Sequence, residues 1–353
     1  MIQINIKIVF TIIVVFFCCP TKQFAQAGKI TGITPVLPAV LKITYPKSNP
    51  LKDALMDVPP TAIFKMDGYY LWDPSVIKVG DTYHLFCSRW PVEKGMSGWV
   101  NSYTIRATSK SLFGPYEFKE VVLEPANHPW ATQGIHNPKI VKAGDKFLLY
   151  HLGIPRWQTG FALADNIEGP WKFVDKPVIN TNNPALFVRK DGSAYAVGKY
   201  KTKYKCDGLW DAKMRAFEAT NFMGPYKMVK DTLNRLPNNF ELEDPTVWWA
   251  NNQYNVICTD WEAKVTGVEK SIVYYTSKNG IDYELYSQIP VWSQKDSIKL
   301  TNGTFLHVKG LERPQVYTNE KNELEALMVS VFPSEKSTPT YIIIRPVNKF
   351  ITK

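Results

Sequence analysis

Residues 72–90 read WDPSVIKVGDTYHLFCSRW, in which a polar residue and a proline are followed by an apolar run, a tight turn and a second apolar run. The same phrase returns four more times, and the equivalent prolines lie 46 to 69 residues apart. Recurrence of one pattern at this spacing is typical of propellers and other repeat arrays. The later copies are HNPKIVKAGDKFLLYHLG from His136, NNPALFVRKDGSAYAVGKY from Asn182, EDPTVWWANNQYNVICTDW from Glu243 and ERPQVYTNEKNELEALMVSV from Glu312.

A second recurring phrase lies between these copies. Each instance places a strand before a Gly-containing turn and an aromatic strand after it, as in ATSKSLFGPYEF from Ala107 and ALADNIEGPWKF from Ala162, which predicts a hairpin. Two hairpins per repeat make a four-stranded antiparallel blade, and five such blades bury their faces by closing round an axis. The sequence therefore predicts an all-β fold, a five-bladed β-propeller. The residues expected to begin its innermost strands are Pro74, Pro138, Pro184, Pro245 and Pro314.

Residues 1–27 have the features of a signal peptide. They contain an uninterrupted apolar run from Ile8 to Cys19, and Ala25-Gln26-Ala27 suits cleavage by signal peptidase. The apolar run is too short for a helix that spans a membrane. We therefore expect export, with no transmembrane span after cleavage.

The exported protein is expected in the periplasm or in the medium. Lipid attachment at Cys18 or Cys19 is disfavoured, because the residue before each of them is not small. After cleavage we expect an N-terminal segment over residues 28–60 and one catalytic propeller domain over residues 61–353. No Gly/Ser-rich linker divides the chain further.

Lys and Arg outnumber Asp and Glu by 42 to 32, which gives a formal net charge of +10. A positive charge favours anionic partners, and a sulfated or uronic-acid polysaccharide would fit. The lysines are scattered along the chain, however, so solubility explains them equally well. No nucleic-acid recognition motif is present, and nucleic acid is not an expected partner.

Cysteine usage argues against a disulfide framework. Signal cleavage leaves Cys87, Cys206 and Cys258, which is an odd number. Cys87 and Cys258 occupy corresponding places within apolar strands, so we expect buried thiols. No Cys/His spacing resembles a zinc site. No metal ligand or cofactor is assigned, although the sequence leaves room for a structural cation on the propeller axis.

With the exception of Trp72, polar side chains occupy the two positions before each repeated proline, where a purely structural repeat would prefer apolar ones. Because the innermost strands start near the axis, we expect these side chains to converge in a central funnel. Glycosidic cleavage needs a carboxylic acid for the leaving oxygen and a carboxylate that activates water or attacks the sugar, and burial raises the pKa of one of them. The position before proline holds Asp73, Asn137, Asn183, Asp244 and Arg313, and the preceding position holds Trp72, His136, Asn182, Glu243 and Glu312.

The phrase WDPSVIKVGDTYHLF, the GPY and GPW hairpins and the E-x-P phrase resemble the five-bladed glycoside hydrolases of family 43 and their relatives in families 32 and 117. The resemblance covers about residues 60–350. It implies that Asp73 is the general base, since family 43 has this base in a first-blade D-P phrase. It also implies that Glu243, in the fourth-blade phrase Glu243-Asp244-Pro245, is the general acid.

The third blade departs from the family pattern. Family 43 has there an Asp that tunes the acid, whereas this chain has Asn183. Either the tuning charge has moved to Asp244, or the acid is another residue. Glu312 lies in a second E-x-P phrase and is the rival acid. In family 117-like enzymes a histidine has the acid role, which keeps His136 and His307 as candidates.

Further side chains are expected to bind the sugar. Arg89 and Asp260 end the second strands of blades one and four and are expected to line the funnel, where Arg suits a sugar carboxylate or sulfate. The polar and aromatic loop over residues 126–138 is the expected specificity loop. The predicted substrate-binding residues are Trp72, Arg89, His136, Asn137, Asn183, Asp260, His307 and Arg313, and the further candidates for stacking on a sugar ring are Trp90, Trp130, Trp157 and Trp261.

The predicted function is that of an exported glycoside hydrolase that cleaves plant or algal polysaccharide fragments by carboxylate acid–base catalysis, with inversion. Asp73 is the predicted base and Glu243 the predicted acid, and Asp244 and Glu312 tune the site or bind the sugar. A glycoside phosphorylase of related fold is an alternative that needs a basic cluster at the funnel. A non-catalytic glycan-binding propeller is another, and Asn183 in place of Asp motivates it.

Overall fold

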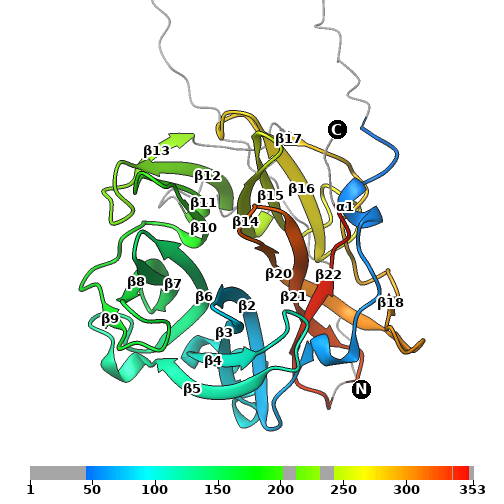
Figure 1. Cartoon of the computed structure of the whole chain (residues 1–353), viewed down its shortest axis with the longest axis horizontal. Coiled ribbons are helices and arrows are strands. Elements are labelled where there is room, and N and C mark those ends of the chain that lie inside the picture. The colour runs from blue at the N-terminus through cyan, green and yellow to red at the C-terminus, as the bar shows by residue number, and fades with distance from the viewer. Residues whose placement is uncertain (1–44, 202–211, 231–241, 336, 350–353) are drawn as a thin grey trace, which may run out of the picture. The chain divides into compact units, whose positions relative to one another are not determined.

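The computed structural model describes residues 45–201, 212–230, 242–335 and 337–349. The predicted signal peptide over residues 1–27 and Cys206 lie outside these ranges. Five sheets of four strands each surround a central axis (Figure 1), which confirms the five-bladed β-propeller. The described helices are short, namely α1 (Pro50–Asp53) and the 3₁₀ turns η1 (Pro60–Ala62), η2 (Val92–Lys94), η3 (Met96–Asn101) and η4 (Pro125–Asn127).

The first four blades are antiparallel meanders whose strands are hydrogen-bonded in chain order. Blade one consists of β2 (Tyr69–Val79), β3 (Thr82–Pro91), β4 (Tyr103–Ser109) and β5 (Glu117–Leu123), and blade two of β6 (Gly134–Ala143), β7 (Lys146–Ile154), β8 (Gln158–Ala164) and β9 (Lys172–Phe173). Blade three consists of β10 (Asn182–Val188), β11 (Ala194–Lys201), β12 (Ala212–Ala219) and β13 (Lys227–Lys230), and blade four of β14 (Leu242–Ala250), β15 (Gln253–Asp260), β16 (Ser271–Ser277) and β17 (Glu284–Leu285).

The fifth blade combines strands from both ends of the described chain. Its order from the axis outward is β20 (Val308–Thr318), β21 (Leu324–Pro333), β22 (Tyr341–Pro346) and β1 (Ile63–Phe64). Ile63 of β1 lies opposite Ile343 of β22. The innermost strands β2, β6, β10, β14 and β20 each contact the next, and β20 contacts β2. Pairing of β1 with β22 thus closes a complete ring of blades.

Residues before β1 pack on the propeller. Leu51 of α1 and Val58 are fully buried in the largest apolar cluster, and Val58 pairs with Leu300 next to the small hairpin of β18 (Ile298–Lys299) and β19 (Phe305–Leu306). No helix in the described part of the chain is long and apolar enough to cross a membrane.

Each innermost strand contains a bulge at its repeated proline. The pairing register with the second strand shifts between the residue two places before the proline and the residue after it. The residue directly before the proline has a positive φ, between 47° and 58°. The sequence analysis predicts that the prolines begin the innermost strands, and this prediction is wrong. Each proline follows two to six residues of its strand. The residues with positive φ are Asp73, Asn137, Asn183, Asp244 and Arg313.

Apolar side chains fill the space between neighbouring blades in four clusters. Cys87 and Cys258 lie in two of these clusters and are buried free thiols, which confirms the prediction for both. The blades therefore bury their faces against each other, and the polar side chains at the bulges of the innermost strands lie at the axis.

We predict that Ile343→Ala weakens ring closure. Ile343 is fully buried and pairs with Ile63 across the blade-five seam, and truncation of a buried Ile to Ala costs about 2–5 kcal/mol. Urea unfolding should show this loss in the free energy of unfolding. Ile281→Ala is the matched control, because Ile281 is 38% exposed and such changes stay within about 0.5 kcal/mol. Equal effects of both substitutions would contradict the prediction.

Candidate active site

The five residues directly before the prolines form a polar ring at the axis, as the sequence predicts. Asn183 Nδ2 donates to Asp244 Oδ1 at 2.8 Å, and the Asn137 amide lies between the Asp73 carboxylate and the Asn183 amide. Arg313 forms ion pairs with both carboxylates, with Asp73 at 3.3 Å between Nε and Oδ1 and with Asp244 through Nη1. One guanidinium therefore joins blade five to blades one and four.

Asp73 is 2% exposed and held from several sides. Ser88 Oγ donates to its Oδ2 at 3.2 Å, its own backbone N–H donates to Ser330 Oγ at 2.8 Å, and His136 Nε2 lies 3.3 Å from Oδ2. Burial raises the pKa of Asp73 to about 7, and the charge of Asp244 adds to the rise while Arg313 opposes it. Asp73 can therefore exchange a proton near neutral pH.

A pocket of about 450 Å³ opens above this ring. Asn137, Asn183 and Arg313 of the ring line it, and all five residues from the position two places before the prolines line it as well. Asp73 and Asp244 lie behind these residues, in contact with them. The described residues that line the pocket are Trp72, Met96, Trp99, His136, Asn137, Leu152, Trp157, Asn182, Asn183, Lys199, Glu243, Trp261, Glu312, Arg313 and Phe332.

Glu243 faces the pocket next to a cation that the sequence analysis missed. Its carboxylate contacts the Lys199 ammonium, and the two side chains are 15% and 4% exposed. Lys199 comes from β11 in blade three, the blade in which Asn183 stands where the family pattern has Asp.

Glu312 is the more deeply buried of the two pocket glutamates. Its side chain is 3% exposed, and the Lys270 ammonium lies 2.9 Å from its Oε1. Burial raises the pKa of Glu312 to about 7, against the opposing effects of Arg313 and Lys270. Glu312 can therefore hold a proton near neutral pH despite its cationic neighbours.

His136 is a neutral imidazole that connects Asp73 with the pocket. Its Nδ1 lies 2.8 Å from Ser102 Oγ and its Nε2 faces Asp73. Burial, with a further contribution from Arg313, lowers the pKa of His136 well below its ordinary value. The Trp99 ring lies 5.0 Å from the imidazole between centroids. The structure thus places His136 at the pocket wall, as expected for a substrate-binding residue.

Aromatic rings form the pocket walls. Trp72 packs edge-on against Phe332 at 4.7 Å between centroids, and Trp99 packs against Trp157 at 5.5 Å. Trp157 is 39% exposed, so its ring is available to a sugar. Of the candidate tryptophans from the sequence, Trp72, Trp157 and Trp261 line the pocket. Trp90 and Trp130 are buried in the protein and do not line it.

Three predicted binding residues lie elsewhere. Arg89 is covered by the rings of Tyr69, Tyr103 and Phe118, and its Nε donates to Tyr103 Oη at 3.2 Å. Asp260 is fully buried and accepts three backbone N–H bonds from residues 264–266, so it shapes a loop. His307 is exposed between β19 and β20, and it is not among the described residues that line the pocket.

A third set of equivalent residues explains the errors at Arg89 and Asp260. Each member lies on a second strand, opposite the residue two places before the proline. Successive strand residues point to opposite faces, so the residues one place later on β3 and β15 point away from the pocket. Aligning the second strands as well as the first would have found this set, which is Ser88, Leu152, Lys199, Thr259 and Ser330.

No group of three or more His, Cys, Asp or Glu side chains suited to a metal ion occurs among the described residues. The cations at the pocket are instead side chains, and each contacts a carboxylate. Lys199 contacts Glu243, Lys270 contacts Glu312, and Arg313 contacts the ring carboxylates. The pocket therefore combines aromatic walls with charges that balance locally, an arrangement suited to a neutral polyhydroxylated ligand and to proton transfer.

Comparison with known proteins agrees with this chemistry. The sequence profile of the glycosyl hydrolases of family 43 matches residues 68–304. The chain is 31% identical over 107 residues to the extracellular endo-α-(1→5)-L-arabinanase of Thermotoga petrophila, a match that covers 28% of this chain and 22% of that protein. The match thus spans less than a quarter of the length of this relative.

Solved structures share the fold at low sequence identity. A GH43_1 enzyme from Xanthomonas citri in complex with xylose superposes with a TM-score of 0.57 and 15% identity over 84% of this chain and 91% of that one. A family 117 glycoside hydrolase produced by the marine bacterium Zobellia galactanivorans gives 0.57 and 12% identity over 85% and 91%. At these identities the likeness concerns the fold alone.

We predict that Glu312→Gln changes the pH dependence of stability. The pKa of Glu312 is about 7 when folded and 4.5 ordinarily, so between these values the folded protein binds more protons than the unfolded one and stability falls as pH rises. The variant lacks this loss, and its stability relative to the wild type should rise by up to about 1.4 kcal/mol per pH unit. Urea unfolding from pH 4.5 to 7 measures the difference, with exposed Glu284→Gln as control. A constant difference would contradict the prediction.

Proposed function

The chain belongs to glycosyl hydrolase family 43 and is a glycosidase, and on that premise we propose that it hydrolyses plant or algal polysaccharide fragments with inversion, using Asp73 as the base. The observation that carries the proposal is the aromatic-walled pocket that Glu243 and Glu312 line and behind whose lining Asp73 is buried. Two of these carboxyl groups have a pKa near 7. Each of these two groups can therefore hold or release a proton near neutral pH, and glycosidic cleavage requires one group that donates a proton and one that accepts it.

In the proposed reaction Asp73 takes the proton of the attacking water. His136, Asn137 and Arg313 contact its carboxylate and line the pocket, so they hold Asp73 in place directly behind the pocket lining. As the C–O bond breaks, the acid donates a proton to the leaving oxygen, and the hydroxyl from water joins the anomeric carbon.

We assign the acid to Glu243, the residue that matches the fourth-blade E-x-P phrase of the family. Its carboxylate contacts the Lys199 ammonium. A specific observation favours Glu312 as the second candidate, because its carboxyl group holds a proton near neutral pH. Asp244 is engaged by Arg313 and Asn183 and is proposed to support the ring rather than to transfer protons.

For the substrate we propose chains of neutral pentose residues. The relatives named above include an arabinanase and an enzyme bound to xylose, and the aromatic walls suit stacking on sugar rings. Lys199, Lys270 and Arg313 each contact a carboxylate, which argues against an anionic sugar at this pocket. The same pairing argues against the phosphorylase alternative, since a phosphate needs cations that are not already neutralised.

The location of the protein is also a proposal. We infer that residues 1–27 direct export to the periplasm or the medium, and the relative from Thermotoga petrophila is described as extracellular. Independence from any cofactor and an axial structural cation remain predictions. Hydrolysis in the presence and absence of a chelator tests both.

We predict that Asp73→Asn lowers kcat/KM on arabinan or xylan oligosaccharides by about 10²–10⁴-fold, the usual contribution of general acid–base catalysis. Glu243→Gln should have a similar effect, and Glu284→Gln should have none. Near-UV circular dichroism verifies folding, and NMR of the first product identifies the anomer. If Glu312→Gln abolishes turnover while Glu243→Gln keeps substantial activity, the acid is Glu312 of blade five and the assignment to Glu243 is wrong.

Two further measurements separate the alternatives. Turnover should not depend on inorganic phosphate, and a requirement for phosphate would indicate a phosphorylase. Neutral oligosaccharides should be cleaved faster than sulfated or uronic-acid oligosaccharides, with little dependence on salt. A preference for anionic substrates that salt weakens would instead support a positive funnel.

A further inference from the structure

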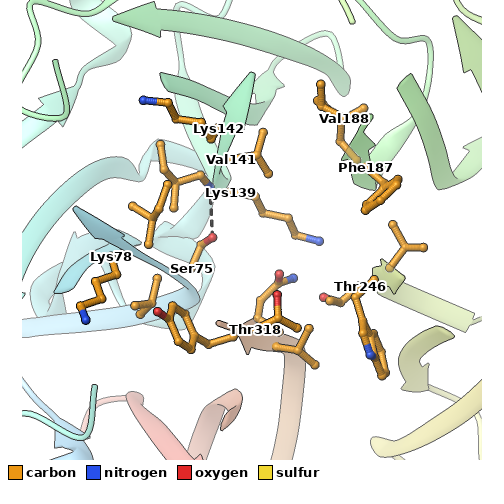
Figure 2. Close-up of a pocket in the computed structure, with 18 of the residues that line it drawn as sticks. Ser75, Lys78, Lys139, Val141, Lys142, Phe187, Val188, Thr246 and Thr318 are labelled. Carbon is orange, nitrogen blue, oxygen red and sulfur yellow. Dashed lines mark hydrogen bonds between the residues drawn. The ribbon is translucent and has the colours of Figure 1, made fainter. Parts of the chain in front are cut away.

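A second and larger pocket, of about 650 Å³, lies on the axis on the other side of the polar ring. It is lined by the innermost strands after their prolines, whereas the candidate active site is lined by residues at and before the ring. Figure 2 shows its lining side chains converging from several blades. The ring therefore separates two pockets that share one axis.

Lys139 reaches the centre of this second pocket. Its side chain extends from β6 toward the middle of the cavity (Figure 2), and it is 4% exposed. Its ammonium donates to Pro245 O at 2.8 Å and to Pro184 O at 3.2 Å. An ammonium has three N–H donors, so one remains for a ligand.

A second polar side chain of this pocket has no hydrogen-bond partner among the described residues. Gln315 follows the blade-five proline, lines the pocket and is 7% exposed, and its amide has no hydrogen bond within the described part of the chain. Its amide can both donate and accept, so it is available to a ligand in the pocket. Thr246 Oγ1 lines the pocket beside it and donates to Pro314 O at 2.7 Å, so its oxygen remains able to accept.

The rim and walls define the ligand further. Phe187, Trp249 and Tyr317 supply aromatic surface, which suits a sugar ring more than a small ion. The charged lining residues are Lys78, Lys139 and Lys142 against Glu320, so the lining is net positive. Figure 2 shows that the ammonium groups of Lys78 and Lys142 point away from the centre, so they attract an anion and Lys139 is the one to contact it.

We propose that this second pocket binds a sugar that bears a carboxylate, such as a uronic acid. The carboxylate accepts the free N–H of Lys139 and an N–H of Gln315, and the sugar ring packs on the aromatic walls. The pKa of Lys139 is lowered by burial to about 8, so its ammonium form predominates at neutral pH. Binding here does not depend on the proposed hydrolysis, because the ring lies between the two pockets.

Saturation-transfer NMR titration of the full chain with glucuronate tests the proposal. Glucuronate should bind at least tenfold more tightly than glucose, which lacks the carboxylate, and than acetate, which lacks the ring. Gln315→Leu should weaken glucuronate binding at least tenfold and leave hydrolysis of neutral oligosaccharides unchanged. Lys139→Met should abolish binding, and Gln315→Leu keeps the test decisive if that variant does not fold. Lys142→Met is the matched control and should retain most of the affinity.

Three results would overturn the proposal. The first is no glucuronate binding to the wild type, and the second is unchanged binding to Gln315→Leu. The third is loss of binding on Trp157→Ala, which would place the ligand in the candidate active site. None of them bears on glycosidase activity, which is measured separately on neutral substrates.

Discussion

The five residues that precede the repeated prolines adopt a left-handed backbone conformation, and the whole axial region depends on it. A residue before proline normally prefers an extended conformation, and a left-handed non-glycine residue costs of the order of 1–3 kcal/mol. Asn and Asp tolerate this region best, and they hold four of the five positions. The bulges turn these side chains toward one another, and the contacts of the ring offset the strain.

The ring then sets the charges of the site. The two ring carboxylates are buried and share one guanidinium. Removing one partner of such a group leaves a buried charge without compensation, at a cost of about 3–5 kcal/mol. Asp73 is therefore important for the stability of the fold as well as for the proposed reaction. Glu243 and Glu312 lie outside the ring, where each contacts a lysine, Lys199 and Lys270 respectively.

Much of this arrangement could be predicted from the sequence, because every innermost strand carries the same short phrase. The bulge in each strand turns the side chain before the proline toward the axis. The fold, the ring and the pocket positions of His136, Glu243 and Glu312 followed from this phrase. The second strands repeat less clearly. Choosing Arg89 rather than Ser88, one residue away, selected the opposite face of the strand.

The remaining differences have other physical causes. Trp99 lines the pocket and Lys270 contacts Glu312 from segments outside the repeated phrases, so spacing alone could not find them. Asp260 carries a charge suited to a funnel, but backbone amides of a neighbouring loop engage it. His307 lies just before the innermost strand of blade five, where the strand has not yet reached the axis.

The pairing of β1 with β22 in blade five makes the proposed active site dependent on the last strands of the chain. Arg313 and Glu312 belong to the last blade, which is finished only when β1, from the start of the propeller, pairs with β22, from its end. Contacts between such distant segments form slowly, because a long loop must close first. A nascent chain that ends before β20 holds Asp73 and Asp244 without their shared guanidinium. The proposed active site is therefore complete only after the final strands have been synthesised and β1 has paired with β22.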